Sequence, residues 1–380
     1  MKKILFGVIC FLTFFINVNA LENLAPNSKS SILLETSTGK ILYEYNSHEK
    51  LPPASMTKIM SMLLIMEAID NNKLSFDSDV LISENAASMG GSQVFLEAGE
   101  TYKVKDLLKG IAIASGNDAV VAMAEKVGGT VENFVNMMNE KAKSLGLKDT
   151  VFKNPHGLDT EGHYSSAYDM AMIAKELLKH EKILEYTSIY EDYLKKNDGS
   201  STWLVNTNKL VRFYDGVDGL KTGFTSSAKY CATTTAKKSN MRLLSVVMGA
   251  ETSDLRSKDT TNLLNYGFNT YKLDLIMSKT KILGNVKVEK GKKDNVDLVL
   301  KEDATSLKKI NDKSTDYFVN LKVDSIKAPV KTGDKVGTAE ILDNDGKFVM
   351  ESDVTVIKNI DKANYFDYLK KNLKILTTGF

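Results

Sequence analysis

One segment constrains the fold of this chain more than any other: a double proline followed by a helix that is apolar on almost every side. Pro52 and Pro53 fix the backbone just before residues 54–58, and seven of the next eight residues, 59–66, are apolar. Prolines are favoured where helices begin, and a helix that is hydrophobic all round lies buried in the centre of a protein. The rest of the first domain is therefore expected to pack around this segment.

Two polar residues stand at the beginning of this buried helix. Ser55 and Lys58 are three residues apart, so on a helix their side chains share one face and can meet. A lysine buried without an anion tends to lose its proton, and a neutral amine beside a hydroxyl can act as a general base. The spacing favours a serine nucleophile, Ser55, with Lys58 as its proton acceptor. An exposed first turn with an ordinary lysine is the alternative, because S-x-x-K alone is common.

The first twenty residues have the pattern of a secretory signal. Lys2 and Lys3 precede an apolar stretch over 4–16, and Val18-Asn19-Ala20 forms a small-residue cleavage site. A retained membrane anchor is the weaker interpretation, because the apolar stretch is shorter than roughly 18 to 20 residues. We therefore expect residues 1–20 to be removed and the protein to be exported, either secreted or held at the extracytoplasmic face of the cell membrane.

Charge and cysteine content exclude two classes of protein. Removing Lys2 and Lys3 from the 50 basic residues leaves 48 against 48 acidic residues, without the basic excess of a nucleic-acid-binding protein. Of the two cysteines, Cys10 lies in the signal, so Cys231 is left alone and no intrachain disulfide can form. Cys231 lies in a strand-like stretch and is expected to be a buried, inert thiol.

The periodicity divides the mature chain into two units and a tail. In residues 21–272 it predicts a hairpin over 31–45, helices over 104–114, 119–127, 131–145, 167–178, 183–193 and 258–271, and strands over 217–224, 229–236 and 242–249. Short alternating stretches over 275–360 predict a β-sandwich. The tail, 361–380, predicts an amphipathic helix, which lies either on an anionic membrane surface or against the β-domain.

Two tripeptides complete a set with Ser55 and Lys58. Ser115-Gly116-Asn117 begins 60 residues after Ser55, and Lys221-Thr222-Gly223 begins 166 residues after it. Three such motifs in this order are the signature of class A β-lactamases and penicillin-binding proteins, which carry out acyl transfer on a serine. A second K-T-G at Lys331 lies in turn-rich sequence and is interpreted as a turn.

Each residue of the two tripeptides has an expected task. Ser115 passes a proton to the leaving amine, and Asn117 binds the substrate amide. Lys221 disfavours protonation of Lys58 and attracts a substrate carboxylate, to which Thr222 offers a hydroxyl. Gly223 lets the substrate backbone lie against the strand.

The oxyanion of the reaction needs donors as well. The backbone N–H of Ser55, at a helix N-terminus, is one candidate. The N–H of Phe224 is the second.

At this point the chain resembles the low-molecular-mass penicillin-binding proteins that act as D-alanyl-D-alanine carboxypeptidases. The resemblance rests on residues 53–58, 114–119, 154–159 and 218–225, and on Gly116, where β-lactamases usually carry Asp. It implies an α/β (α+β) penicillin-recognising domain over 21–272, with an antiparallel sheet that unites the hairpin with the three later strands and is flanked by helices. It also favours the membrane surface for the tail.

The resemblance further implies a reaction. Ser55 forms an acyl-enzyme with the penultimate D-Ala of a peptidoglycan stem peptide, with Lys58 as proton acceptor and Ser115 assisting. Arg256 is placed near the carboxylate site. β-Lactam antibiotics are expected to bind covalently at Ser55, and no cofactor is required.

Other interpretations stay open beside this one. His156, Asp159, Glu161 and His163 crowd one loop, but their spacing does not match a helical metal site, so a structural loop is preferred to a metal site. Glu132 is interpreted as an exposed helical acid rather than a deacylating base. A β-lactamase, a transpeptidase and a non-catalytic wall-binding protein remain the rival functions.

Overall fold

A five-stranded antiparallel sheet forms the centre of the first unit. The computed structural model describes residues 23–312 and 316–370. The strands follow the order β2-β1-β9-β8-β7 and are β2 (Ile41–Tyr45), β1 (Ser30–Glu35), β9 (Met241–Ala250), β8 (Lys229–Lys238) and β7 (Val217–Thr225). Strand β1 pairs with β9, so that Ile32 lies opposite Val246. The predicted union of the N-terminal hairpin with three later strands is therefore confirmed.

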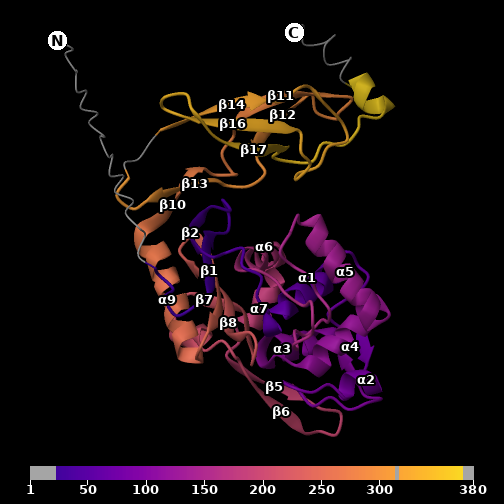
Figure 1. The fold of residues 1–380 in the computed structure, drawn as a ribbon. Helices are drawn as coiled ribbons and strands as arrows, with labels where there is room; N and C mark the ends of the chain where they lie inside the picture. Colours follow the sequence, from indigo (N-terminus) through magenta and orange to yellow (C-terminus); the bar gives the residue numbers. More distant parts are fainter. Residues whose placement is uncertain (1–22, 313–315, 371–380) are drawn as a thin grey trace, which may run out of the picture.

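Helices cover both faces of this sheet (Figure 1). Helix α9 (Ser253–Thr270) packs on one face against β8 and β9, and α6 (Ala167–Leu177) packs on the other against β1 and β9. Helix α1 (Lys58–Asp70), preceded by the short η1 (Ala54–Thr57), packs against α6, α4 (Asn117–Gly128) and α5 (Val131–Ser144). Helix α3 (Val104–Ala114) packs against α4. Ten of the thirteen residues of α1 are buried, as its apolar sequence predicts.

Short elements connect these helices and the sheet. The short helices are α2 (Glu84–Ala87), η2 (Glu181–Ile183), α7 (Leu184–Thr187) and α8 (Leu210–Phe213). Two small hairpins are formed by β3 (Asp79–Leu81) with β4 (Thr101–Lys103) and by β5 (Glu191–Lys195) with β6 (Ser201–Val205).

Two predicted helices have different bounds in the structure. The helix predicted over 183–193 is wrong after residue 187, because Glu191–Lys195 forms strand β5 with Leu194 buried and its neighbours outward. The helix predicted to begin at 258 begins at Ser253, where the Thr252 hydroxyl accepts a hydrogen bond from Leu255 N at 3.2 Å. Arg256 is therefore a residue of the first turn of α9.

The second unit is a β-rich domain with a separate core. Strand β10 (Tyr271–Met277) pairs with β13 (Ala304–Lys309). The larger sheet has the order β14 (Tyr317–Lys322), β16 (Gly337–Asp343), β17 (Phe348–Val356), β12 (Asn295–Leu300), β11 (Gly284–Glu289) and β15 (Ile326–Lys327). The second K-T-G lies in a turn in which Asp334 N donates to Lys331 O at 3.1 Å, as predicted.

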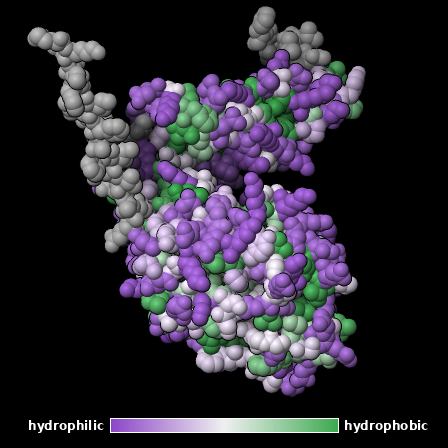
Figure 2. All heavy atoms as spheres, viewed as in Figure 1, coloured by the Kyte–Doolittle hydropathy of each residue, from purple (hydrophilic) through white to green (hydrophobic). Residues whose placement is uncertain are grey.

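The surface between the two units is hollowed (Figure 2). A cavity of about 1070 Å³ lies there, and its walls include Thr38 and Asn240 of the first unit and Leu275 and Glu351 of the second. Of the predicted tail helix, residues 365–370 are helical, and Tyr365 and Phe366 are exposed. No helix among the described residues is long and apolar enough to cross a bilayer. The predicted signal, 1–20, and the rest of the tail, 371–380, lie outside the described residues.

Candidate active site

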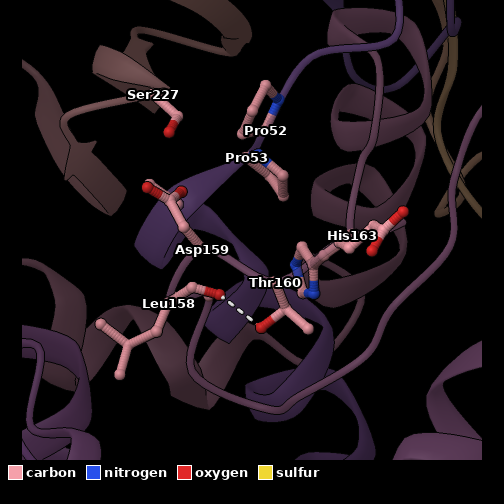
Figure 3. Close-up of a pocket in the computed structure, with 10 residues that line it drawn as sticks. Pro52, Pro53, Leu158, Asp159, Thr160, His163 and Ser227 are labelled. Atoms are coloured by element: carbon pink, nitrogen blue, oxygen red, sulfur yellow. Dashed lines mark hydrogen bonds between the residues drawn. The ribbon is translucent and has the colours of Figure 1, made fainter.

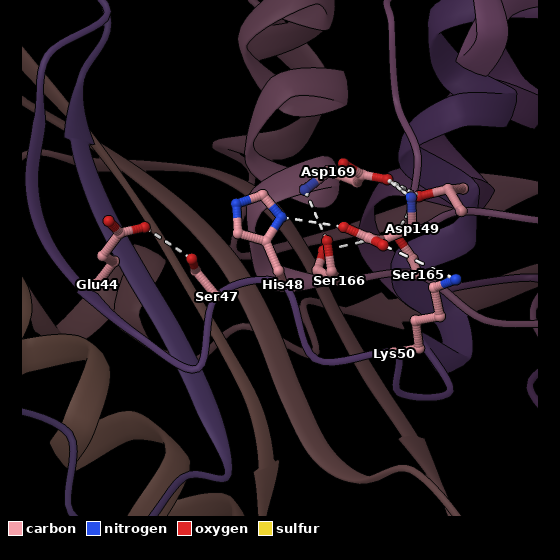
Figure 4. Close-up of polar contacts among 9 residues, drawn as sticks. Glu44, Ser47, His48, Lys50, Asp149, Ser165, Ser166 and Asp169 are labelled. Atoms are coloured by element: carbon pink, nitrogen blue, oxygen red, sulfur yellow. Dashed lines mark hydrogen bonds and ion pairs between the residues drawn. The ribbon is translucent and has the colours of Figure 1, made fainter.

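The approach to the double proline is fastened by a polar network (Figure 4). His48 Nδ1 lies 3.0 Å from Asp149 Oδ2, and Asp149 N donates to Asp169 Oδ2 at 2.8 Å. One residue before Pro52, Leu51 pairs with Ser165 through two backbone hydrogen bonds. The entry to the Ser55 turn is thus tied to the segment before α6.

Ser55 lies in η1 and Lys58 is the first residue of α1. Lys58 is fully buried, and its Nζ lies 2.9 Å from Ser55 Oγ, 2.7 Å from Asn117 Oδ1 and 2.8 Å from His156 O. Burial lowers the pKa of Lys58 well below its usual value, and the charge of Lys221 lowers it further, while Asp118 opposes the shift. The predicted contact between Ser55 and Lys58 is therefore present.

Three oxygen atoms surround Lys58 Nζ within hydrogen-bond distance. Asn117 Oδ1 and His156 O can only accept, so they take two N–H donors. The remaining neighbour is the Ser55 hydroxyl, so a neutral amine, with two N–H groups, would have its lone pair available for the Ser55 proton. This arrangement can take a proton from Ser55 without any movement of Lys58.

The second motif lies at the junction of α3 and α4. Asn117 uses its amide oxygen for Lys58, and its Nδ2 donates to Gly90 O at 2.7 Å. Ser115 is buried, has a left-handed backbone with φ of 64°, and its Oγ has no hydrogen-bond partner among the described residues. A Cβ on Gly116 would lie 2.9 Å from Asp118 Oδ1, so only glycine fits without a shift.

Asp118 is a residue of this site that we did not identify from the sequence. Its carboxylate is buried and accepts hydrogen bonds from Val94 N at 3.0 Å and Leu96 N at 3.2 Å. It therefore fixes the segment before β4 beside Asn117. The two backbone N–H groups that donate to it lie more than twenty positions earlier in the chain, so no local sequence pattern indicates this role.

The third motif lies in β7, at the edge of the sheet that is nearest to η1. Lys221 is buried, and its Nζ donates to Thr222 O at 3.0 Å and lies 3.4 Å from Thr207 Oγ1. Thr222 Oγ1 donates to the same Thr207 Oγ1 at 2.7 Å. Burial and the charge of Arg256 lower the pKa of Lys221 to about 7. Thr207, which follows β6, is a second residue that sequence reasoning missed.

The structure explains the glycine at position 223 differently from the sequence-based prediction. A Cβ at this position would lie 2.8 Å from Pro53 O and 3.1 Å from Ser55 N. Contacts below 3.0 Å essentially never occur for real Cβ atoms. The missing side chain therefore allows β7 to approach the backbone of the Ser55 turn itself.

Arg256 and Phe224 lie beside this strand. Arg256 is buried, and its charge is near enough to lower the pKa of Lys221. The side chain of Phe224 is more than half exposed, and its ring centroid lies 4.4 Å from that of Tyr230. Roles for Arg256 in carboxylate binding and for the Phe224 N–H in an oxyanion hole stay predictions.

A loop over residues 154–163 closes the other side of the Ser55 turn. A Cβ on Gly157, whose φ is 88°, would lie 1.8 Å from Ala54 O, so the two backbones are in direct contact. His163 Nδ1 accepts from Lys153 N at 3.0 Å, which leaves the ring proton on Nε2 to donate to Thr57 Oγ1 at 2.9 Å. Burial lowers the pKa of His163 to about 4, so the ring is neutral.

The same loop bounds a small pocket (Figure 3). Its volume is about 340 Å³, and Pro53, Asp159 and Ser227 are among its lining residues. Thr225 Oγ1, at the end of β7, donates to Asp159 Oδ1 at 2.7 Å. Both ring nitrogens of His163 are engaged in the bonds above, and no group of three potential metal ligands occurs in residues 23–312 and 316–370.

Two remaining predictions concern single residues outside the site. Glu132 is exposed on α5, as expected of an ordinary helical acid. Cys231 is buried in β8, and burial raises the pKa of its thiol to about 11. The exposure of Glu132 and the burial of Cys231 are confirmed, and the inertness of the Cys231 thiol stays a prediction.

Comparison with known proteins gives two family matches and many relatives. The family described as D-alanyl-D-alanine carboxypeptidase matches residues 17–252, and the C-terminal domain of penicillin-binding protein 5 matches residues 271–362. The D-alanyl-D-alanine carboxypeptidase DacF of Bacillus subtilis is 51% identical over 353 residues, which cover 93% of this chain and 90% of that protein. DacC of Escherichia coli is 33% identical, with 93% of this chain and 89% of DacC covered.

Solved structures extend this likeness to three dimensions. Penicillin-binding protein 5 from Haemophilus influenzae superposes with a TM-score of 0.69 at 30% identity, covering 88% of this chain and 98% of the other. Penicillin-binding protein D2 from Listeria monocytogenes, in its ampicillin-bound form, superposes with a TM-score of 0.57 at 32% identity, covering 64% of this chain and 98% of the other.

Proposed function

Since this chain belongs to the D-alanyl-D-alanine carboxypeptidase family of serine peptidases, we propose that it removes the terminal D-Ala from peptidoglycan stem pentapeptides through an acyl-enzyme on Ser55. The observation that carries this proposal is the environment of Lys58. A buried lysine with two acceptor oxygens and a serine hydroxyl around its Nζ is prepared to act as a base.

The proposed acylation step begins at the Ser55 hydroxyl. As Ser55 Oγ attacks the penultimate D-Ala carbonyl, its proton moves to the lone pair of Lys58 Nζ. The backbone N–H groups of Ser55 and Phe224 hold the developing oxyanion. The proton then passes from Lys58, by way of the unpartnered Ser115 hydroxyl, to the leaving nitrogen, and free D-Ala departs.

Deacylation repeats these transfers with water as the nucleophile. Lys58, neutral again, takes a proton from a water that attacks the ester carbonyl. The tetrahedral intermediate collapses, and Ser55 Oγ leaves and recovers its proton. One water is consumed for each D-Ala released, and no cofactor takes part.

The proposed binding site for the substrate carboxylate is formed by Lys221, Thr222 and Arg256. Both cations are buried, and burial together with the charge of Arg256 lowers the pKa of Lys221 to about 7. A bound carboxylate offsets this repulsion and raises the pKa of Lys221, so the substrate completes the charge balance of the site. Asn117 binds the substrate amide through the second hydrogen of its Nδ2.

A β-lactam carries an amide carbonyl and a carboxylate in a comparable arrangement, so we propose that penicillin acylates Ser55 in the same way. The ampicillin-bound Listeria relative supports this expectation. A second candidate function is transpeptidation, because the Streptomyces K15 relative, whose structures are described as a DD-transpeptidase, is 30% identical over 251 residues.

The proposed place of action is outside the cytoplasm, where peptidoglycan lies. A signal over residues 1–20 would direct export of the chain and be cleaved after Ala20, and the 361–380 tail would hold the mature protein on the membrane surface. The exposed Tyr365 and Phe366 on the described part of the tail helix support this second point.

The deciding experiment uses purified protein without residues 1–20, a pentapeptide ending in D-Ala-D-Ala, and labelled penicillin. The wild type should release D-Ala and take up one label, and Ser55→Ala should lose both. Thr332→Ala, in the second K-T-G, should retain both. Transfer of the acyl group to an added amine in place of water would identify a transpeptidase, and rapid penicillin turnover would identify a β-lactamase.

A further inference from the structure

Two large aromatic side chains lie on the outward face of the β5–β6 hairpin. Tyr193 and Trp203 are directly opposite each other in the strand register, and their side chains are 57% and 59% exposed. Side chains opposite each other on one face of an antiparallel pair have Cβ atoms about 5 Å apart. The two exposed side chains therefore lie next to each other on one face of the hairpin, and we call this pair the aromatic platform. Two large aromatic side chains exposed next to each other make this face a candidate binding surface.

The hairpin holds the platform in a fixed position. Leu194 and Leu204, on the opposite face, are buried in the core of the first unit, so the alternation of the strands directs Tyr193 and Trp203 outward. Lys109 Nζ of α3 donates to Tyr193 O at 2.8 Å and forms an ion pair with Asp192. The platform is thus presented by a fastened element rather than by a free loop.

Polar groups border the platform on both sides. In the register, the next pair toward one end is Glu191 with Val205, and toward the other end it is Lys195 with Ser201. One acidic and one basic side chain flank the rings, so the border carries no net charge. That border does not suit an anionic lipid or a nucleic acid, which need a basic surface. Flat rings bordered by hydrogen-bonding groups suit a sugar, whose ring has apolar faces and a polar rim.

The platform is connected to the active site by a short length of chain. Trp203 is four residues before Thr207, whose hydroxyl accepts from Thr222 and lies beside Lys221. Four extended residues span about 13 Å. The hairpin also lies at the end of the molecule away from the β-rich domain (Figure 1). A polymer on the platform therefore runs within reach of a peptide in the Ser55 site.

We propose that Tyr193 and Trp203 bind the glycan strands of peptidoglycan, by stacking on the faces of successive N-acetylated amino sugars. The enzyme would hold the polymer at the platform while a stem peptide from a neighbouring strand occupies the Ser55 site. The proposal rests on the proposed function for the identity of the polymer. Binding of sugar at the platform is a separate property that requires no catalysis.

Trp203 makes this binding measurable, because it is the only tryptophan of the chain. The protein used is the mature chain with Ser55→Ala, and the probe is the uncharged β-1,4-linked tetramer of N-acetylglucosamine. We expect a saturable change in tryptophan emission. Tyr193→Ala in the same background removes one of the two stacking rings and should weaken binding about tenfold, which corresponds to about 1.4 kcal/mol. Phe318→Ala removes an equally exposed ring of the β-rich domain and should leave binding unchanged.

Several results of this titration would overturn the proposal. One is an emission that does not respond to the tetramer, and another is a response that Tyr193→Ala leaves intact. An emission change that depends on protein concentration would assign the platform to contact with a second copy of the chain. A change that appears with anionic vesicles and not with sugar would assign it to a membrane.

A second measurement separates this proposal from the proposed function. In the catalytically active chain, Trp203→Ala with Tyr193→Ala should lower D-Ala release from intact wall polymer but not from the free pentapeptide. Equal loss on both substrates would contradict a role in polymer binding. If the wild type releases no D-Ala from either substrate, the proposed function fails, and the emission titration still decides the platform.

Discussion

Replacing Gly157 by alanine tests whether the 154–163 loop sets the position of the nucleophile. The new Cβ would lie 1.8 Å from Ala54 O, and such contacts do not persist below 3.0 Å, so the two backbones must separate by about 1.2 Å. Ala54 is the residue directly before Ser55, so this shift reaches Ser55 and changes its contact with Lys58. A misplacement of about 1 Å in a reacting group lowers a rate by about 100-fold. Left-handed backbone also costs alanine roughly 1–2 kcal/mol.

The assay is the rate of Ser55 acylation by a fluorescent penicillin, together with D-Ala release from a pentapeptide. Gly162→Ala is the matched control, because Gly162 lies in the same loop with φ of 75° but its Cβ would meet only the flexible end of Lys153, at 3.2 Å. Both variants carry the backbone strain, and only Gly157→Ala carries the contact with Ala54. We expect Gly157→Ala to acylate about 100-fold more slowly than Gly162→Ala. Equal acylation rates for the two variants would refute the reasoning.

Three further predictions follow from buried groups. Lys221, with a pKa of about 7 in the free enzyme, loses its charge as the pH rises through that value. The kcat/KM for a substrate with a free carboxylate should therefore fall above pH 7. A pH profile of kcat/KM without this alkaline decrease would contradict the prediction. In the folded state the pKa of His163 is about 4, against its usual 6.5, so the unfolded chain binds the proton at a higher pH than the folded chain does. The free energy of unfolding, measured with urea, should therefore fall as the pH drops from 6.5 to about 4. A stability that does not change over this pH range would count against the prediction. Cys231 should resist alkylation in the folded protein at pH 8 and react at once in denaturant, as followed by mass spectrometry, and fast labelling of the native chain would disprove its burial.

The sequence predicted the parts of the site that depend on local geometry. Ser55 and Lys58 are three residues apart in a helical segment, so their contact follows from helix geometry alone. The apolar run after Lys58 predicted its burial, and burial is the first cause of its lowered pKa. The sheet was predictable as well, because the pattern marks the N-terminal hairpin and three later strands, and the order of these strands confirms the expectation.

The residues that were missed act through contacts between distant segments. Thr207 accepts a hydrogen bond from Thr222, fifteen positions later, and Asp118 accepts hydrogen bonds from residues more than twenty positions earlier. No periodicity connects such pairs. The strand at Glu191–Lys195 was mistaken for a helix for a similar reason, because its partner Ser201–Val205 decides its state.

The position of β9 between β1 and β8 has a consequence for the timing of folding. The N-terminal hairpin has its partner strand only at Met241–Ala250, so the central sheet cannot be completed until some 250 residues have emerged. Pairings this distant in sequence form slowly. Until β9 pairs with β1, the strand that carries Lys221 is not joined to the N-terminal hairpin, so the complete surroundings of Ser55 form late in folding. The proposed reaction of Ser55 with penicillin should therefore appear in a refolding chain only with the completed sheet.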